Sequence, residues 1–112
     1  MESLKKNADF QRVYRNGRVF GNRCLVGYVL NRDDREPLRL GISVSKKVGN
    51  SVVRHRVKRL VREIFRVNRQ LCEEGCDIVI AAKKEAKGKT YSEMEKAVFH
   101  LMKNLLSREI EC

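Results

Sequence analysis

The sequence has no tryptophan, few aromatic residues and no long hydrophobic run. No stretch of about eighteen consecutive apolar residues is present that could span a membrane, and residues 1–10 lack the apolar centre of a signal peptide. A basic helix that binds a membrane surface would need bulky aromatic side chains, and aromatic residues make up 6% of the chain. We therefore expect a cytoplasmic protein that does not bind membranes.

The chain also lacks the paired cysteines and histidines of a zinc site. Cys72 and Cys76 are separated by three residues instead of the two of a zinc knuckle, and no second pair lies nearby to complete a tetrahedral site. Cys24 and Cys112 are isolated, so we expect four reduced thiols. The acidic turn at 31–37 could hold a cation, but such turns are usually only solvated. The sequence therefore predicts no metal ligand and no cofactor bound by the protein.

Acidic residues are few, and they are not clustered. The fourteen acids are scattered over turns, helix ends and the C-terminal region. A protein nuclease would need carboxylates grouped around metal ions, or a histidine paired with an acid. Glu63 lies among basic residues and is interpreted as a local charge partner of Arg62. We therefore predict no catalytic residue in this chain.

What the chain has in excess is positive charge. Its 112 residues include 25 lysines and arginines, which give a net charge of +11 and a pI near 9.9. Such a charge attracts polyanions and speeds association with them. A hydrophobic content of 42% supports a folded core, and the length fits one domain. We therefore expect a single domain over residues 1–112 that binds nucleic acid.

The positive charge is concentrated in residues 46–69, which contain a single acid. From residue 52 onward apolar residues recur at helical spacing, which predicts a helix with one side facing the core. The core-facing positions are Val53, Val57, Leu60, Val61 and Ile64. The basic positions on or beside the opposite side are Arg54, His55, Arg56, Lys58, Arg59, Arg62, Arg66 and Arg69. An ordinary solvated face would mix acids with these bases, so the pattern favours a polyanion as partner.

The start of this helix is suited to phosphate as well. Asn50 or Ser51 can cap the helix, and Gly49 allows a sharp entry. The free N–H groups of the first turn would then lie beside Lys46 and Lys47 and favour an anion.

Hydrophobic periodicity and turn residues predict six elements in the order α-β-β-α-β-α. They are a short helix capped by Asn7 and ended near Gly17, strands at 18–30 and 38–47, the basic helix, a buried strand at 77–82, and a last helix that starts at the capping box of Thr90 and Glu93. We expect an α+β two-layer sandwich, in which a small mixed sheet has helices on one side and can leave its other face open.

Two surfaces outside the basic helix could bind a ligand. Phe10 and Tyr14 share one face of the first helix, where they serve equally well as core residues or as a platform for a ligand. In the strand at 38–47, alternate residues that include Ser43 and Ser45 form a small polar face over which a nucleic-acid backbone could lie. An ordinary solvated strand face explains the same pattern, so both interpretations stay open.

Three segments of the chain resemble the bacterial ribonuclease P protein subunit. They are KNADF at 6–10, followed by Val13, Tyr14 and Gly17, then LGISVSKKVGN at 40–50 and RHRVKRLVRE at 54–63. The resemblance implies an RNA-binding domain that joins a large catalytic RNA and promotes removal of the 5′ leader from precursor tRNA, with Mg²⁺ required by the RNA subunit. It also implies a left-handed β-α-β crossover, which is rare among folds.

The resemblance assigns roles to residues by their position. The residues that would contact the catalytic RNA are Arg54, Arg56, Lys58, Arg59 and Arg62, and the basic pattern adds Lys46, Lys47, His55 and Arg66. The aromatic residues that would line a cleft for the leader are Phe10, Tyr14 and Tyr28, to which the strand pattern adds Ser43 and Ser45. The implied partners are the catalytic ribonuclease P RNA and the precursor-tRNA leader, with no obligate protein partner.

One position departs from the family, whose Arg-Asn-Arg triplet is Arg54-His55-Arg56 here. An asparagine side chain both donates and accepts hydrogen bonds, whereas an imidazole can also become cationic, so a polar contact would be replaced by a pH-sensitive one. Composition and strand pattern alone would also fit a ribosomal or general RNA-binding protein without a processing role.

Overall fold

The computed structural model describes residues 1–106, which form a five-stranded sheet with three α-helices and two short 3₁₀ helices. The strands are β1 (Glu2–Ser3), β2 (Arg18–Gly21), β3 (Leu25–Asn31), β4 (Arg39–Val44) and β5 (Cys76–Ala82). The helices are α1 (Asn7–Asn16), α2 (Ser51–Val67), α3 (Tyr91–Leu106), η1 (Arg69–Leu71) and η2 (Lys84–Ala86). Cys24, Cys72 and Cys76 are free thiols, and Cys112 lies outside the described residues.

The sheet is mixed, with the strand order β1-β4-β5-β3-β2. β4 pairs in parallel with both β1 and β5, whereas β3 pairs antiparallel with both β5 and β2. The parallel neighbours β4 and β5 are joined through α2, which makes the β-α-β unit that the resemblance implies. The predicted α+β class with a small mixed sheet is confirmed.

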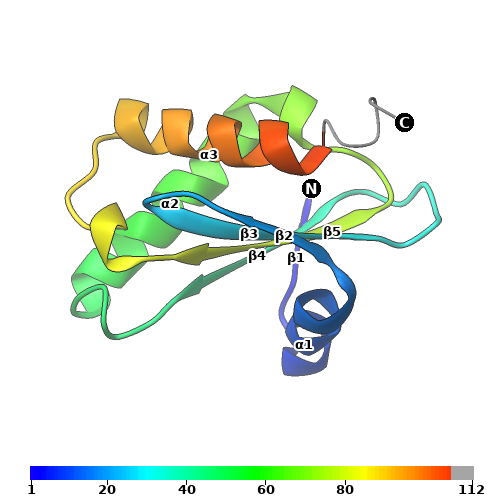
Figure 1. Ribbon diagram of the computed structural model, residues 1–112, viewed down its shortest axis with the longest axis horizontal. Coiled ribbons are helices and arrows are strands. Elements are labelled where there is room, and N and C mark those ends of the chain that lie inside the picture. The colour runs from blue at the N-terminus through cyan, green and yellow to red at the C-terminus, as the bar shows by residue number, and fades with distance from the viewer. Residues whose placement is uncertain (107–112) are drawn as a thin grey trace.

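Helices α2 and α3 cover one face of the sheet and enclose the main core (Figure 1). The alternation of β4 places Leu40, Ile42 and Val44 on this face, as the period-two pattern predicted. β5 contributes Ile78 and Ile80, both fully buried. The helix layer is therefore held by apolar side chains that the sequence pattern had already assigned to the core.

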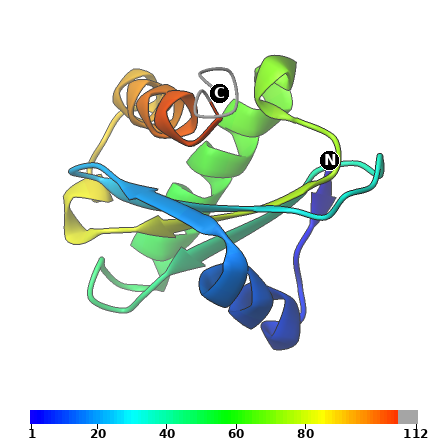
Figure 2. The ribbon, with the colours of Figure 1, turned by 45° about the vertical axis from the view of Figure 1, so that its right-hand side comes forward.

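Helix α1 lies against the opposite face of the sheet, as both views show (Figures 1 and 2). It closes a second, smaller core of Leu4, Val13 and Val79, with Phe10 and Tyr14 packed beside it. Helices were expected on one side of the sheet, but the structure places one helix on the other side. That face is consequently part covered and part open, which creates the groove described below.

The expected single strand at 18–30 is a hairpin of two strands. Asn22 turns the chain, because its side-chain oxygen accepts hydrogen bonds from the backbone N–H groups of Cys24 and Leu25 at 3.0 and 2.9 Å. The turn does carry a hairpin signal, the Gly21-Asn22 pair, but apolar residues continue on both sides of it. Hydrophobic periodicity alone therefore joined β2 and β3 into one strand.

The N-terminal segment also differs from the expectation. Residues 2–3 form β1, a two-residue edge strand that was not predicted, because two residues carry no periodicity. Asn7 was expected to cap α1, but the N-cap position is Lys6, and no side-chain hydrogen bond caps the helix there. The other two expected caps are present: Asn50 accepts from the N–H of Val53 at 3.0 Å, and Thr90 and Glu93 form the reciprocal capping box.

Candidate nucleic-acid interface

Helix α2 is fixed to the sheet by its apolar side and exposes its basic side. Val57, Val61, Ile64 and Phe65 are fully buried, and the first three were predicted from the sequence. The exposed members of the predicted basic set on α2 are His55, Arg56, Arg59, Arg62 and Arg66. Their direction is thus set by the packing of the opposite side of the same helix.

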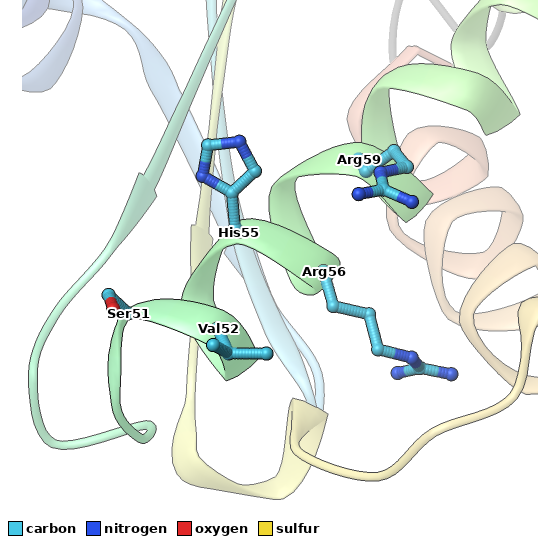
Figure 3. A pocket seen from close by; sticks show the side chains of 5 residues that line it. All are labelled: Ser51, Val52, His55, Arg56 and Arg59. Atoms are coloured by element: carbon cyan, nitrogen blue, oxygen red, sulfur yellow. The ribbon is translucent and has the colours of Figure 1, made fainter.

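A surface hollow lies along the N-terminal half of α2 (Figure 3). Five side chains line it: Ser51, Val52, His55, Arg56 and Arg59. These residues recur at helical spacing and therefore lie along the same part of the helix surface. Figure 3 shows that the side chains of His55 and Arg56 point in different directions from the helix. Val52 is 76% exposed and provides an apolar contact among the cations. We call this surface the basic hollow.

The turn before α2 adds to the positive potential of the basic hollow. Lys46 and Lys47 are exposed, while Val48 is buried and anchors the turn. The first turn of α2 contains no acidic residue, so its free N–H groups and helix dipole are not offset by a local carboxylate. This arrangement favours phosphate at the start of the helix, as the sequence predicted.

Two residues of the predicted RNA-contact set have protein partners. Arg66 forms a salt bridge with Glu63, donating from Nε to both carboxylate oxygens at 2.9 Å, and this contact raises the pKa of Arg66 and lowers that of Glu63. The expected partner of Glu63 was Arg62, so that prediction was wrong: residues three apart on a helix meet, and adjacent residues do not. Arg56 donates from Nη2 to the carbonyl oxygen of Lys89 at 3.0 Å.

Arg54 and Lys58 are only partly exposed, unlike the other members of the predicted basic set on α2. Arg54 is half-buried, and its Nε has no hydrogen-bond partner among the described residues. Lys58 was expected on the exposed basic side, but the structure places it beside a separate groove on the α1 face of the sheet. The basic residues of α2 therefore serve two surfaces.

We call the second surface the sheet groove. It runs between α1, β4 and α2 and is lined by Lys5, Asn7, Phe10, Tyr14, Ile42, Ser43, Val44 and Lys58. Phe10 rests on Gly41, where an added Cβ would lie 2.6 Å from Phe10 Cζ. The groove thus combines aromatic faces, a serine hydroxyl and two lysines, which suits an unpaired nucleic-acid strand.

The structure brings together most of the residues predicted for this groove. Phe10 and Tyr14 lie 6.4 Å apart between ring centroids, and Tyr14 meets Tyr28 edge-on at 4.9 Å. Tyr28 is not among the lining residues and instead supports Tyr14 from β3. Ser45 is exposed beyond the end of β4 and also lies outside the lining. Lys5 and Asn7 line the groove but were missed, because isolated polar residues carry no periodic signal.

A buried carboxylate holds α1 in place above the sheet. Asp77 on β5 is fully buried and accepts hydrogen bonds from Arg39 at 2.9 and 2.7 Å and from Arg32. Burial by itself raises the pKa of Asp77, but hydrogen bonds from the two arginines outweigh it and hold the pKa below its ordinary value. Arg12 of α1 approaches the same carboxylate at 3.5 Å and also pairs with Asp9 at 2.9 Å. The sequence pattern gave no signal for this network, since its members are far apart in the chain.

A further acid, in the turn between β3 and β4, is also engaged within the protein. Asp34, in the turn between β3 and β4, pairs with Arg32, whose hydrogen bond holds the pKa of that carboxyl below its ordinary value. Within residues 1–106, no group of three or more His, Cys, Asp or Glu side chains is placed to hold a metal ion. None of the helices in this range has the length and apolar character needed to cross a membrane.

Comparison with known proteins gives one consistent result. The family model for ribonuclease P matches residues 1–106. The ribonuclease P protein component of Lachnoclostridium phytofermentans is 54% identical over 102 residues, which is 91% of this chain and 87% of that protein. The corresponding protein of Clostridium novyi is 50% identical over 103 residues and 91% of each chain.

Solved structures agree with the sequence relatives. The ribonuclease P protein of Staphylococcus aureus superposes with a TM-score of 0.84 at 40% identity, covering 93% of this chain and 94% of that one. The ribonuclease P protein from Thermotoga maritima superposes with a TM-score of 0.82 at 29% identity, and the match covers 93% of this chain and 97% of that one.

Proposed function

The chain belongs to the family of ribonuclease P protein components, the protein subunits of a tRNA-processing ribonuclease, and on this premise we propose that it binds two RNAs at two separate surfaces. The basic hollow would bind the catalytic RNA, and the sheet groove would bind the 5′ leader of precursor tRNA. The observation that carries this proposal is the division of α2, whose basic residues line the hollow on one side and the groove on the other.

The catalytic RNA would be held through its phosphates. The residues proposed for this contact are Lys46, Lys47, Arg54, His55, Arg56, Arg59, Arg62 and Arg66. Lysine and arginine side chains that neutralise phosphates release counterions, which makes association tight and strongly dependent on salt. Arg66 and Arg56 are already engaged with protein partners, so we expect His55, Arg59 and Arg62 to be the more available contacts.

The leader would lie in the sheet groove as an unpaired strand. Phe10 and Tyr14 offer aromatic faces on which bases can stack, at about 1–3 kcal/mol for each base. Lys58 and Lys5 would neutralise leader phosphates, which moves Lys58 from the catalytic-RNA set to the leader set. Stacking does not require a particular base, and this tolerance suits a subunit that meets many different leaders.

The chemistry of cleavage is assigned to the RNA and to the Mg²⁺ that it binds. Two carboxylates beneath α1 agree with this assignment, because Asp9 and Asp77 are engaged by arginines and hold α1 in place. The protein would therefore contribute binding and orientation of the substrate. We expect it to act in the cytoplasm, without a cofactor of its own and without an obligate protein partner.

The proposal is tested by cleavage of precursor tRNA at low Mg²⁺ concentration, with the catalytic RNA, the protein, or both. We expect the protein to stimulate the RNA and to be inactive alone. Holoenzymes with Phe10→Ala or Tyr14→Ala should bind precursor tRNA roughly tenfold more weakly, while affinity for mature tRNA stays unchanged. Cleavage by the protein alone, or the absence of stimulation, would contradict the proposed role, and the latter would favour a general RNA-binding protein.

A further inference from the structure

The connection between β5 and α3 is a compact basic segment that the proposed function leaves without a role. Residues 83–89 contain four lysines and one acid, Glu85. Its composition by itself predicts a polar linker. In the structure it lies beside the N-terminal half of α2 (Figures 1 and 2), next to the basic hollow.

Backbone hydrogen bonds give the segment a defined shape. The N–H of Lys83 donates to the carbonyl of Cys24 at 2.8 Å, and the N–H of Ala86 donates to the carbonyl of Lys83 at 3.0 Å within η2. Ala86 is fully buried and anchors the segment in the main core. A lysine on such a turn loses less backbone entropy on binding than one on a flexible linker.

The four lysines fall into two classes. Lys83 donates from Nζ to the carbonyl oxygen of Asn22 at 2.7 Å, and Lys89 is half-buried. Lys84 and Lys87 are exposed, and within the described part of the chain neither is paired with an acid. These two ammonium groups are therefore available to an anionic partner without first breaking an ion pair.

Arg56 links this segment to α2. Its Nη2 donates to the carbonyl oxygen of Lys89 at 3.0 Å, and the same side chain lines the basic hollow. Figure 3 shows Arg56 directed away from His55. The positive surface consequently continues from the hollow, through Arg56, onto the connection. The apolar residue of the connection, Ala86, is buried, so the segment offers no apolar anchor to a lipid surface.

We propose that residues 83–89 form a second phosphate-binding segment, in which Lys84 and Lys87 contact the backbone of the catalytic RNA beyond the part bound by α2. This inference rests on the proposed function, because it extends the same partner over a second element. The chemistry is that of phosphate neutralisation by ammonium groups without recognition of base sequence.

The test compares the full-length protein with a Lys84→Gln/Lys87→Gln variant in binding to the catalytic RNA over a range of salt concentrations. Each lost phosphate contact should reduce the magnitude of the slope of log affinity against log salt concentration by about 0.7 to 0.9. The slope measured for the double variant should therefore be smaller in magnitude than that of the wild type by about 1.4 to 1.8. A matched control is Lys6→Gln/Lys103→Gln, which removes the same charge at exposed positions outside the connection and outside α2. The control should leave the slope nearly unchanged.

Two results would overturn the inference. An unchanged slope in the Lys84→Gln/Lys87→Gln variant would show that the connection does not touch the RNA. If the slope decreased by the same amount in the control, the effect would be explained by the change in net charge alone. An Arg59→Gln variant distinguishes failure of the inference on residues 83–89 from failure of the proposed function. If Arg59→Gln weakens binding and the lysine variant does not, the basic hollow stands and the connection is excluded; if the wild-type protein does not bind the RNA, both ideas fail.

Discussion

Asp77 is the residue that ties the groove to the stability of the fold. It is fully buried, whereas the arginines around it are partly exposed, with side-chain exposures of 13% for Arg32, 27% for Arg39 and 49% for Arg12. A buried carboxylate is stable only when its charge is paired and its oxygens accept hydrogen bonds. Because Arg12 belongs to α1 and Arg39 to β4, the same carboxylate also determines how α1 lies over the sheet.

We expect Asp77→Asn to lower the free energy of unfolding by about 3 kcal/mol near pH 7, because two arginines lose their anionic partner. The pKa of Asp77 is depressed in the folded protein, so its contribution is complete above the unfolded pKa of about 3.9 and is lost as pH falls through the folded value. The difference between wild type and variant, measured by urea unfolding at several pH values, should therefore shrink below about pH 4.

Glu63→Gln is the control for this prediction, since Glu63 forms an exposed salt bridge, and such pairs contribute little. A constant difference between wild type and Asp77→Asn across the acidic range would contradict the assigned role of the carboxylate.

At the scale of secondary-structure elements, the position of α1 decides whether the sheet groove exists. The helix is held by Asp9 and Arg12, which pair with each other beside Asp77, and by Phe10, which lies on Gly41. The absence of a side chain at Gly41 lets the aromatic ring approach the strand closely. Ser43, two residues further along the same face of β4, remains open beside the ring and lines the groove.

Gly41→Ala should displace Phe10 and α1, because the new methyl group would stand 2.6 Å from the ring. We expect an overpacking cost of about 1–3 kcal/mol in stability and roughly tenfold weaker binding of precursor tRNA by the holoenzyme, with mature tRNA unaffected. Thermal unfolding and equilibrium binding of both tRNAs measure these effects. Gly21→Ala is a matched control in β2, where the nearest atom to a new Cβ is 3.5 Å away. Equal losses for precursor and mature tRNA would argue against a role of α1 in leader binding.

At the scale of the whole molecule, a net charge of +11 is arranged on two differently shaped surfaces. The basic hollow is a depression on the surface of one helix, lined by exposed cations, whereas the sheet groove lies between three elements and has aromatic walls. The main core beneath α2 and α3 and the smaller core beneath α1 hold these surfaces in fixed relation. The positive charge attracts RNA in general. The different shapes of the two surfaces allow one to bind a structured RNA and the other to bind an unpaired strand.

Assembly with the catalytic RNA should therefore depend strongly on salt. If six to ten phosphates are neutralised, affinity should fall by roughly 10³ to 10⁵ between 50 and 200 mM monovalent salt. Binding of the leader should show a shallower dependence, since about two lysines face the groove and stacking is insensitive to salt. Titrations of the catalytic RNA, and of precursor against mature tRNA, at several salt concentrations measure both slopes. A steeper slope for the leader than for the catalytic RNA would contradict the division into two surfaces.

The sequence by itself determined the features that depend on local spacing. The 3.6-residue period of α2 assigned Val57, Val61 and Ile64 to the core and its arginines to solvent, and the two-residue period of β4 assigned Ser43 to the face opposite the main core. The Asn50 cap and the Thr90–Glu93 capping box are likewise local, because each is completed within three residues. Motifs in the same segments carried the resemblance to the family.

Only the tertiary structure decided which distant residues meet. It placed α1 on the second face of the sheet, brought Lys58 and Lys5 into one groove, and gathered the arginines around Asp77. It also turned the linker at 83–89 toward α2 through the contact of Arg56 with Lys89. These relations depend on how a mixed sheet orders its strands and on which side each connection crosses, and periodicity within a single segment carries no information about either.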